Sequence, residues 1–247
     1  MKKKRRIFIL VFLLFVISVI ITLYINNTAN TKAKLKESFL KWENGEVSSE
    51  QEGSKIIKRL NKYLSKHSDI RNDEIYDICD SFKIFEKKNL RIVQYSENLL
   101  FYGSSGKASY QIAMLDNHVK TIINNGTINI EDIRQVDENT YYLYGKNYQF
   151  SNLAGIIILR LSIHNNELEL IKNVVSKDNL PSEYSLDFDH ATTDGPYDLV
   201  DTVYYKNSNS FYFKDITEDG SHITFTIGDI EHNFALDNDG LYHYQGN

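Results

Sequence analysis

The N-terminal stretch decides what kind of protein this chain can be. Residues 2–6 are five consecutive Lys and Arg, and residues 7–25 form an apolar run that only Ser18 and Thr22 interrupt. As a helix, such a run extends roughly 28 Å at about 1.5 Å per residue, close to the hydrocarbon thickness of a bilayer. Secretory signal peptides carry a shorter apolar region, about 7–15 residues, followed by a small-x-small cleavage site. The segment after this run is a poor match to such a site, so the run is predicted to be an uncleaved signal anchor.

The cations before the run predict its orientation. Lys and Arg in short flanking segments favour the cytoplasmic side of a membrane, whereas long domains are translocated largely regardless of their charge. We expect residues 1–6 to be a cytoplasmic stub at the cell membrane and the chain beyond residue 25 to be extracytoplasmic. A stub of this length cannot fold, so any activity is expected outside the cell or through a membrane partner of the helix.

The chain beyond the anchor is acidic. The full chain has a net charge of −5, and without the five N-terminal cations there remain 23 Lys and Arg against 33 Asp and Glu, a net of −10. Negative charge repels a phosphate backbone, so no nucleic acid partner is expected, and anionic lipid surfaces are expected to be unfavourable. The single cysteine, Cys79, cannot form an internal disulfide, and we expect it to be a small, partly buried apolar residue. The abundance of Asn, Ile, Lys and Tyr is typical of an AT-rich Gram-positive bacterium.

Residues 26–89 are predicted to be a linker and a helical region. The linker is residues 26–31, whose sequence is NNTANT. Apolar residues then recur at helical spacing in three segments, which are residues 32–43, 47–67 and 73–85. In the second segment Ser49 is followed three residues later by Glu52, which is the pattern of a capping box. Short amphipathic helices of this kind must pack on one another or on a neighbouring sheet.

Residues 90–247 are predicted to form an extracytoplasmic β-rich domain. The hydrophobic period changes to 2, and short runs of β-branched and aromatic residues are separated by turn pairs such as Asp-Asn and Asn-Asn. The predicted fold class is therefore mainly β (α+β overall), with an antiparallel β-meander closed as a sandwich or a barrel. A weak repeat begins at Glu97 and again at Glu138, 41 residues later. This is the length of a propeller blade, so a small β-propeller-like domain is the alternative.

An acidic segment is the candidate for metal chemistry. Residues 183–201 include one Glu, five Asp and one His, with no Lys or Arg. The carboxylates of Asp187, Asp189 and Asp194 suit Ca²⁺ or Mg²⁺. The imidazole of His190 suits a transition metal, so a divalent cation is the one cofactor that the sequence suggests. The other interpretation is a solvated loop whose Asp side chains cap turns.

Two further patterns suggest binding surfaces. An Asp-Gly hairpin turn near residue 239 is predicted to put His232, Phe234 and His243 on one face of the sheet, where the two imidazoles could bind a metal. Tyrosine pairs such as residues 141–142 could form an aromatic face for a glycan or a peptide. Both patterns also occur without function, because scattered histidines are common on surfaces and tyrosine is favoured in strands.

The sequence lacks the common catalytic signatures. It contains no H-E-x-x-H, no G-x-G-x-x-G and no P-loop. We therefore expect a non-catalytic binding or interaction module, anchored to the lipid bilayer through residues 7–25, that binds a protein, peptide or glycan at the cell envelope. One alternative is an envelope hydrolase or divalent-metal-dependent enzyme that uses the acidic segment 187–201. Another is an accessory subunit of a membrane complex.

Overall fold

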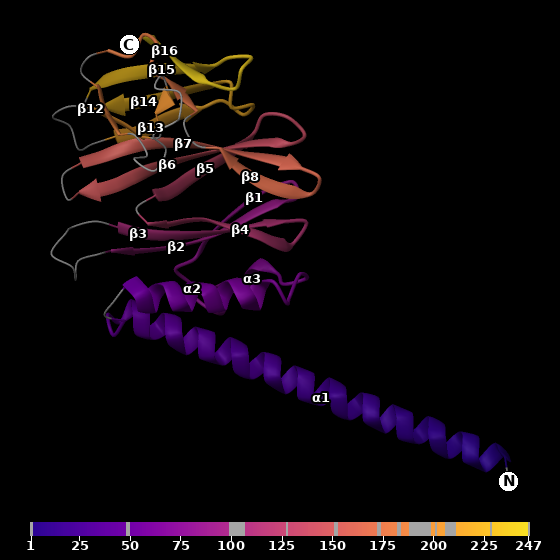
Figure 1. Ribbon diagram of the computed structural model, residues 1–247. Coiled ribbons are helices and arrows are strands. Elements are labelled where there is room, and N and C mark those ends of the chain that lie inside the picture. Colours follow the sequence, from indigo (N-terminus) through magenta and orange to yellow (C-terminus); the bar gives the residue numbers. More distant parts are fainter. Residues whose placement is uncertain are drawn as a thin grey trace. The chain divides into compact units, whose positions relative to one another are not determined.

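In the computed structural model, the chain folds into two compact units (Figure 1). The helical unit comprises Met1–His67 and Arg71–Asp80, and the β unit comprises Ser68–Ile70 and Ser81–Asn247. The described residues are 2–47, 50–98, 107–126, 128–150, 153–171, 174–181, 184–187, 199–200, 202–205, 211–227 and 229–246. Ser49, the predicted helix cap, lies outside them.

Helix α1, Lys2–Glu43, runs without a break through the predicted linker. From Phe12 onward it is long and apolar enough to cross a membrane, and eight large apolar side chains between Phe12 and Ile21 are exposed. The linker predicted at residues 26–31 is helical because it contains neither Gly nor Pro. The Thr31 hydroxyl also donates to the Asn27 carbonyl at 2.8 Å. The apolar segment and the packed end of α1 are therefore one continuous helix.

Two more helices, α2 (Glu50–Leu64) and α3 (Asn72–Tyr76), complete the helical unit. The predicted helical stripes of the first two segments are confirmed, since both are buried. The buried side chains are Leu35, Phe39 and Trp42 of α1 and Ile56, Ile57, Leu60, Tyr63 and Leu64 of α2. Lys36 and Lys32 of α1 lie 2.8 and 3.0 Å from the Asp77 carboxylate, and their hydrogen bonds lower the pKa of Asp77 to about 2.

The third helix is much shorter than predicted. It ends at Tyr76, and strand β1 (Lys83–Lys87) begins where the helix predicted at residues 73–85 was to continue. Phe85 pairs with Ile92 of the next strand and packs in the core of the β unit. Strand pairing therefore overrides the local helical period.

Helices α1 and α2 approach each other closely at Gly53. A Cβ atom at this position would lie 2.5 Å from a ring carbon of Trp42, closer than the 3.0 Å that real Cβ contacts keep. The contact requires glycine because any side chain would displace the indole ring.

Gly53→Val is expected to destabilise the helical unit by about 1–3 kcal/mol, the usual cost of overpacking. The helix propensity gained by replacing Gly, less than about 1 kcal/mol, does not offset it. Denaturant titration followed by the fluorescence of Trp42, the single Trp of the chain, measures the loss. Ser54→Val, at the neighbouring and partly exposed position, is the matched control. An equal loss in both variants would contradict the close approach.

The β unit contains three mainly antiparallel sheets (Figure 1). Sheet A has the order β1-β2-β3-β4, with β2 Leu90–Asn98, β3 Lys107–Leu115 and β4 His118–Gly126. Sheet B has the order β10-β12-β7-β6-β5 with β8 beside β7; its strands are β5 Ile128–Gln135, β6 Thr140–Phe150, β7 Leu153–His164, β8 Glu167–Ile171, β10 Tyr184–Asp187 and β12 Thr202–Tyr205. Sheet C has the order β11-β9-β16-β15-β14-β13; its strands are β9 Val175–Ser176, β11 Leu199–Val200, β13 Phe211–Ile216, β14 His222–Ile227, β15 Ile230–Leu236 and β16 Tyr242–Gly246.

Sheet B is buried on both faces. Tyr141 packs in a cluster with Leu90 of sheet A, whereas the next residue, Tyr142, packs in a second cluster with Phe225 of sheet C. Residues 156–159 of β7 alternate between the same two clusters. A strand buried on both faces needs a continuous apolar run, which β7 has. The tyrosine pair therefore belongs to the two cores, and the predicted aromatic binding face is not formed there.

The predicted antiparallel β-rich fold is confirmed, but the described sheets are not closed into a barrel. Each sheet instead contains one meander of four strands, which are β1–β4, β5–β8 and β13–β16. Between the second and third meanders, β9 and β11 join sheet C, whereas β10 and β12 join sheet B. The two copies of the predicted repeat fall on two of these meanders, but they do not begin at equivalent positions. Glu97 lies within β2, whereas Glu138 lies in the turn before β6.

The predicted turn residues are confirmed at two hairpins. Asp116 and Asn117 join β3 to β4 with φ of 48° and 64°, and Asn165 and Asn166 join β7 to β8 with φ of 52° and 62°. Two successive residues with positive φ give the turn twist that antiparallel strands prefer, and Asn and Asp tolerate this conformation.

A buried polar cluster joins sheets A and B. The Gln94 side chain of β2 donates to the Ile130 carbonyl of β5 at 3.1 Å and accepts from the Ile130 N–H at 2.8 Å. Gln111 of β3 donates to Gln94 Oε1 at 2.9 Å and to the Ile128 carbonyl at 2.7 Å. Both glutamines are fully buried, and β5 is an edge strand of sheet B. The two side chains thus take the place of a neighbouring strand and satisfy the edge amides.

Candidate functional site

The predicted metal ligands fall largely outside the described residues. Asp189, His190 and Asp194 all do, and of Asp187 only the backbone is described, where it pairs with Thr202 in sheet B. The metal site in the acidic segment stays a prediction from the sequence.

Three hairpin turns of the β unit form an open cleft of about 680 Å³. Lys87 and Lys88 come from the β1–β2 turn, residues 135–138 from the β5–β6 turn, and Glu218 and Asp219 from the β13–β14 turn. Each sheet supplies one wall, so the cleft exists only when the three sheets are stacked. Its volume lies within the range of about 300–1,000 Å³ that is typical of ligand pockets. The sequence does not indicate this site, because the turns come from distant segments that share no motif.

The walls of the cleft differ in charge. Sheet A supplies two lysines, and sheets B and C supply the carboxylates of Asp137, Glu138, Glu218 and Asp219. The Ser221 N–H donates to the Asp219 carboxylate at 3.0 Å, and this bond together with nearby hydroxyl groups lowers the pKa of Asp219 to about 2. The acidic walls thus include a permanently ionised group at physiological pH. The cleft suits a ligand with a cationic group toward the carboxylates and an anionic or polar group toward the lysines.

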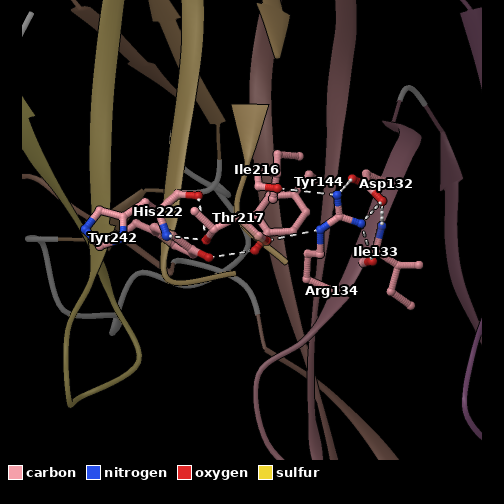
Figure 2. A network of polar contacts seen from close by, with 8 residues as sticks. All are labelled: Asp132, Ile133, Arg134, Tyr144, Ile216, Thr217, His222 and Tyr242. Atoms are coloured by element: carbon pink, nitrogen blue, oxygen red, sulfur yellow. Dashed lines mark hydrogen bonds and ion pairs between the residues drawn. The ribbon is translucent and has the colours of Figure 1, made fainter. Parts of the chain in front are cut away.

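Arg134 attaches the β13–β14 turn to sheet B (Figure 2). Its guanidinium pairs with both carboxylate oxygens of Asp132 at 2.8 and 2.9 Å, and donates to the carbonyls of Thr217 at 3.2 Å and Ile216 at 3.4 Å. The Thr217 N–H donates to the His222 carbonyl at 3.0 Å, which closes the turn. Charge-assisted hydrogen bonds are stronger than neutral ones. Arg134 therefore holds one acidic wall of the cleft in position.

Two buried tyrosines, Tyr144 and Tyr242, also contact this turn and are hydrogen-bonded to each other (Figure 2). The Tyr242 hydroxyl donates to the Gly220 carbonyl, so the Tyr144 hydroxyl must be the donor in the 2.6 Å bond between the two rings' hydroxyls. Burial raises the pKa of Tyr144 and of Tyr242 well above the ordinary value. Gly220 has a φ of 68°, and a Cβ there would lie 2.9 Å from the Tyr144 hydroxyl. The turn therefore requires glycine for both its conformation and its packing.

The predicted face with two histidines is wrong. The β15–β16 loop contains five residues, 237–241, where a two-residue turn was predicted. The odd loop length changes the register, so His243 lies on the face opposite to His232. His232 is buried and stacked on the Phe225 ring, and burial lowers its pKa. His243 is paired instead with the Asp237 carboxylate at 2.7 Å.

One group of possible metal ligands occurs in the helical unit. The donor atoms of Glu43, Cys79 and Asp80 lie within 4.8 Å of one another. Cys79 is buried, as the sequence predicted, and its thiol lies 3.2 Å from a Glu43 carboxylate oxygen. The set mixes a soft donor with two hard ones, and the hydrogen bond already satisfies the thiol. The group is therefore interpreted as structural.

Comparison of the chain with protein-family models, with curated proteins and with solved structures gives no match. The function is therefore argued from the chemistry of the chain itself.

Proposed function

We propose that the chain is a single-pass membrane protein whose β unit lies outside the cytoplasm and binds a partner at the cell envelope without catalysing a reaction. The observation that supports this best is the continuity of α1, which extends from an exposed apolar segment to the buried Leu35, Phe39 and Trp42. Exposed apolar surface of this extent is unfavourable in water and favourable in a bilayer. The five cations before it favour the cytoplasm.

The cleft between the three turns is the proposed contact surface for the partner. Its support is the combination of two lysines, four carboxylates and a turn that Arg134 and Tyr242 hold in place. A protein or peptide segment with both charges matches these walls. Charged groups that are already held in position favour binding, because their side chains lose less conformational entropy when the partner binds.

For the fold, we propose that the three meanders are stacked as blades of a small, open propeller-like domain. Each has four antiparallel strands, and the central one packs on both neighbours. A sandwich of two sheets would leave one face of sheet B outside the core.

A photo-cross-linking amino acid at Glu218 tests the contact surface. In cells, we expect a discrete cross-linked species from Glu218, because this exposed residue lines the cleft. The same amino acid at Asp215, exposed in β13 outside the cleft, is expected to give none. Asp137→Lys with Glu138→Lys should abolish the species by reversing the charge of one wall. Equal cross-linking from both positions, or none from Glu218, would contradict the proposal.

A further inference from the structure

The outward face of α2 carries a row of cations. They are Lys55, Lys58, Arg59 and Lys62 of α2 and Lys66 just after it, and all five are exposed. At 100° per residue they fall within an arc of about 100°, opposite the buried apolar stripe of the same helix. We call these five residues the cationic face.

The cationic face is free of ion pairs among the described residues. Within the described ranges none of its five members forms an ion pair, whereas ion pairs engage nine cations elsewhere. The nine are Lys32, Lys36, Lys41, Arg71, Arg91, Lys120, Arg134, Lys146 and Lys214. Like charges three or four residues apart on a helix repel each other. In a chain that is otherwise acidic, this concentration of cations suits an anionic partner.

The cationic face runs toward the apolar segment of α1. Helix α2 lies beside α1 and runs back along it (Figure 1), with Gly53 against Trp42. Counting back from that contact at about 1.5 Å per residue, Lys62 and Lys66 are level with roughly residues 33 and 29 of α1. These levels lie roughly 6–12 Å beyond residue 25, where the predicted membrane segment ends. The headgroup zone of a bilayer extends about 5–8 Å beyond its hydrocarbon core.

We infer that Lys62 and Lys66, together with the exposed Lys34 of α1, bind the anionic headgroups of the adjacent membrane leaflet. The inference rests on the proposed membrane anchoring. Each cation near an anionic membrane surface contributes about fivefold in affinity, and the attraction reaches about one Debye length, roughly 8–10 Å. Because α2 is packed on α1, the lipid contact would fix the tilt and rotation of the membrane helix.

The test uses the full chain in phosphatidylcholine bilayers with spin-labelled lipids. Electron paramagnetic resonance measures the association of labelled phosphatidylglycerol relative to labelled phosphatidylcholine. We expect the chain to prefer the anionic lipid and the preference to fall with added salt. Lys62→Gln with Lys66→Gln should lower this preference at least about threefold, and the preference that remains is due to the N-terminal cations. The charge-matched control, Lys83→Gln with Lys214→Gln at exposed positions of the β unit, should leave the preference unchanged.

An unchanged lipid preference in the α2 variant overturns the inference. Release of the unmodified chain from the same bilayers by alkaline carbonate overturns the membrane anchoring instead, so the two failures are distinguishable. Added inorganic polyphosphate probes a soluble polyanion as the partner. If the α2 variant loses polyphosphate binding but keeps its lipid preference, the cationic face binds a soluble polyanion and the assignment to lipid is wrong.

Discussion

Gln94→Ala is expected to destabilise the β unit by at least about 3 kcal/mol, since each buried polar group left without a partner costs about 1–3 kcal/mol. The substitution leaves the N–H and the carbonyl of Ile130 unsatisfied and removes an acceptor of Gln111. It also opens a cavity between sheets A and B. Urea denaturation of the full chain in detergent measures the loss.

Two further variants separate hydrogen bonding from packing at this position. Gln94→Leu keeps most of the volume but forms no hydrogen bond, so it should also be strongly destabilising. Gln245→Ala removes an exposed glutamine and is expected to change stability by no more than about 0.5 kcal/mol. A Gln94→Leu variant as stable as the original chain would contradict the role assigned to the buried amide.

The β unit is expected to lose stability steeply above about pH 10, where tyrosine ionises in the unfolded chain. Burial raises the pKa of Tyr144 and Tyr242, so both stay protonated in the folded state. Their contribution is fully present below the unfolded pKa of 10.0 and is lost as the pH rises above it. Each tyrosine lowers the free energy of unfolding by about 1.4 kcal/mol per pH unit in this range.

Tyr242→Phe tests this pH dependence directly. Near pH 8 the variant should be less stable by about 1–3 kcal/mol, because the Tyr144 hydroxyl and the Gly220 carbonyl lose their partner. Above about pH 10 the free energy of unfolding of the variant should fall less steeply with pH than that of the original chain, because one of the two buried tyrosines no longer contributes. Tyr76→Phe, at a tyrosine of α3 that is 40% exposed, is the control. If the free energy of unfolding falls equally steeply with pH in Tyr242→Phe and in the original chain, the role assigned to the buried tyrosine pair is wrong.

The features that depend on local rules could be predicted from the sequence. The apolar stripes of α1 and α2 follow from helical spacing, and the turns at residues 116–117 and 165–166 follow from the tolerance of Asn and Asp for positive φ. The predicted linker at 26–31 failed because polar composition alone does not end a helix. The helix predicted at 73–85 ends early, at Tyr76, and strand pairing takes its last three residues, 83–85.

The features that depend on stacking could not be predicted. The contacts of Arg134 join segments about 80 residues apart in the chain, and the three-walled cleft joins turns that are about 50 to 130 residues apart. One signal was present: Ile92, Val93 and Tyr95 around Gln94 are apolar and alternate between the two faces of the strand, which is typical of a strand that is buried on both faces. The cationic face was also visible as charges at helical spacing, but the total charge of the chain hides it.

The most direct test of the account is the orientation of the full chain in the membrane of the cell. An epitope is placed before residue 2, and protease is added to intact cells from which the wall has been removed. If the N-terminus is cytoplasmic and the β unit is extracytoplasmic, we expect the protease to digest the β unit and to leave the epitope on a short fragment that the membrane protects. Digestion of the β unit only after the cells are lysed would contradict the proposed extracytoplasmic position.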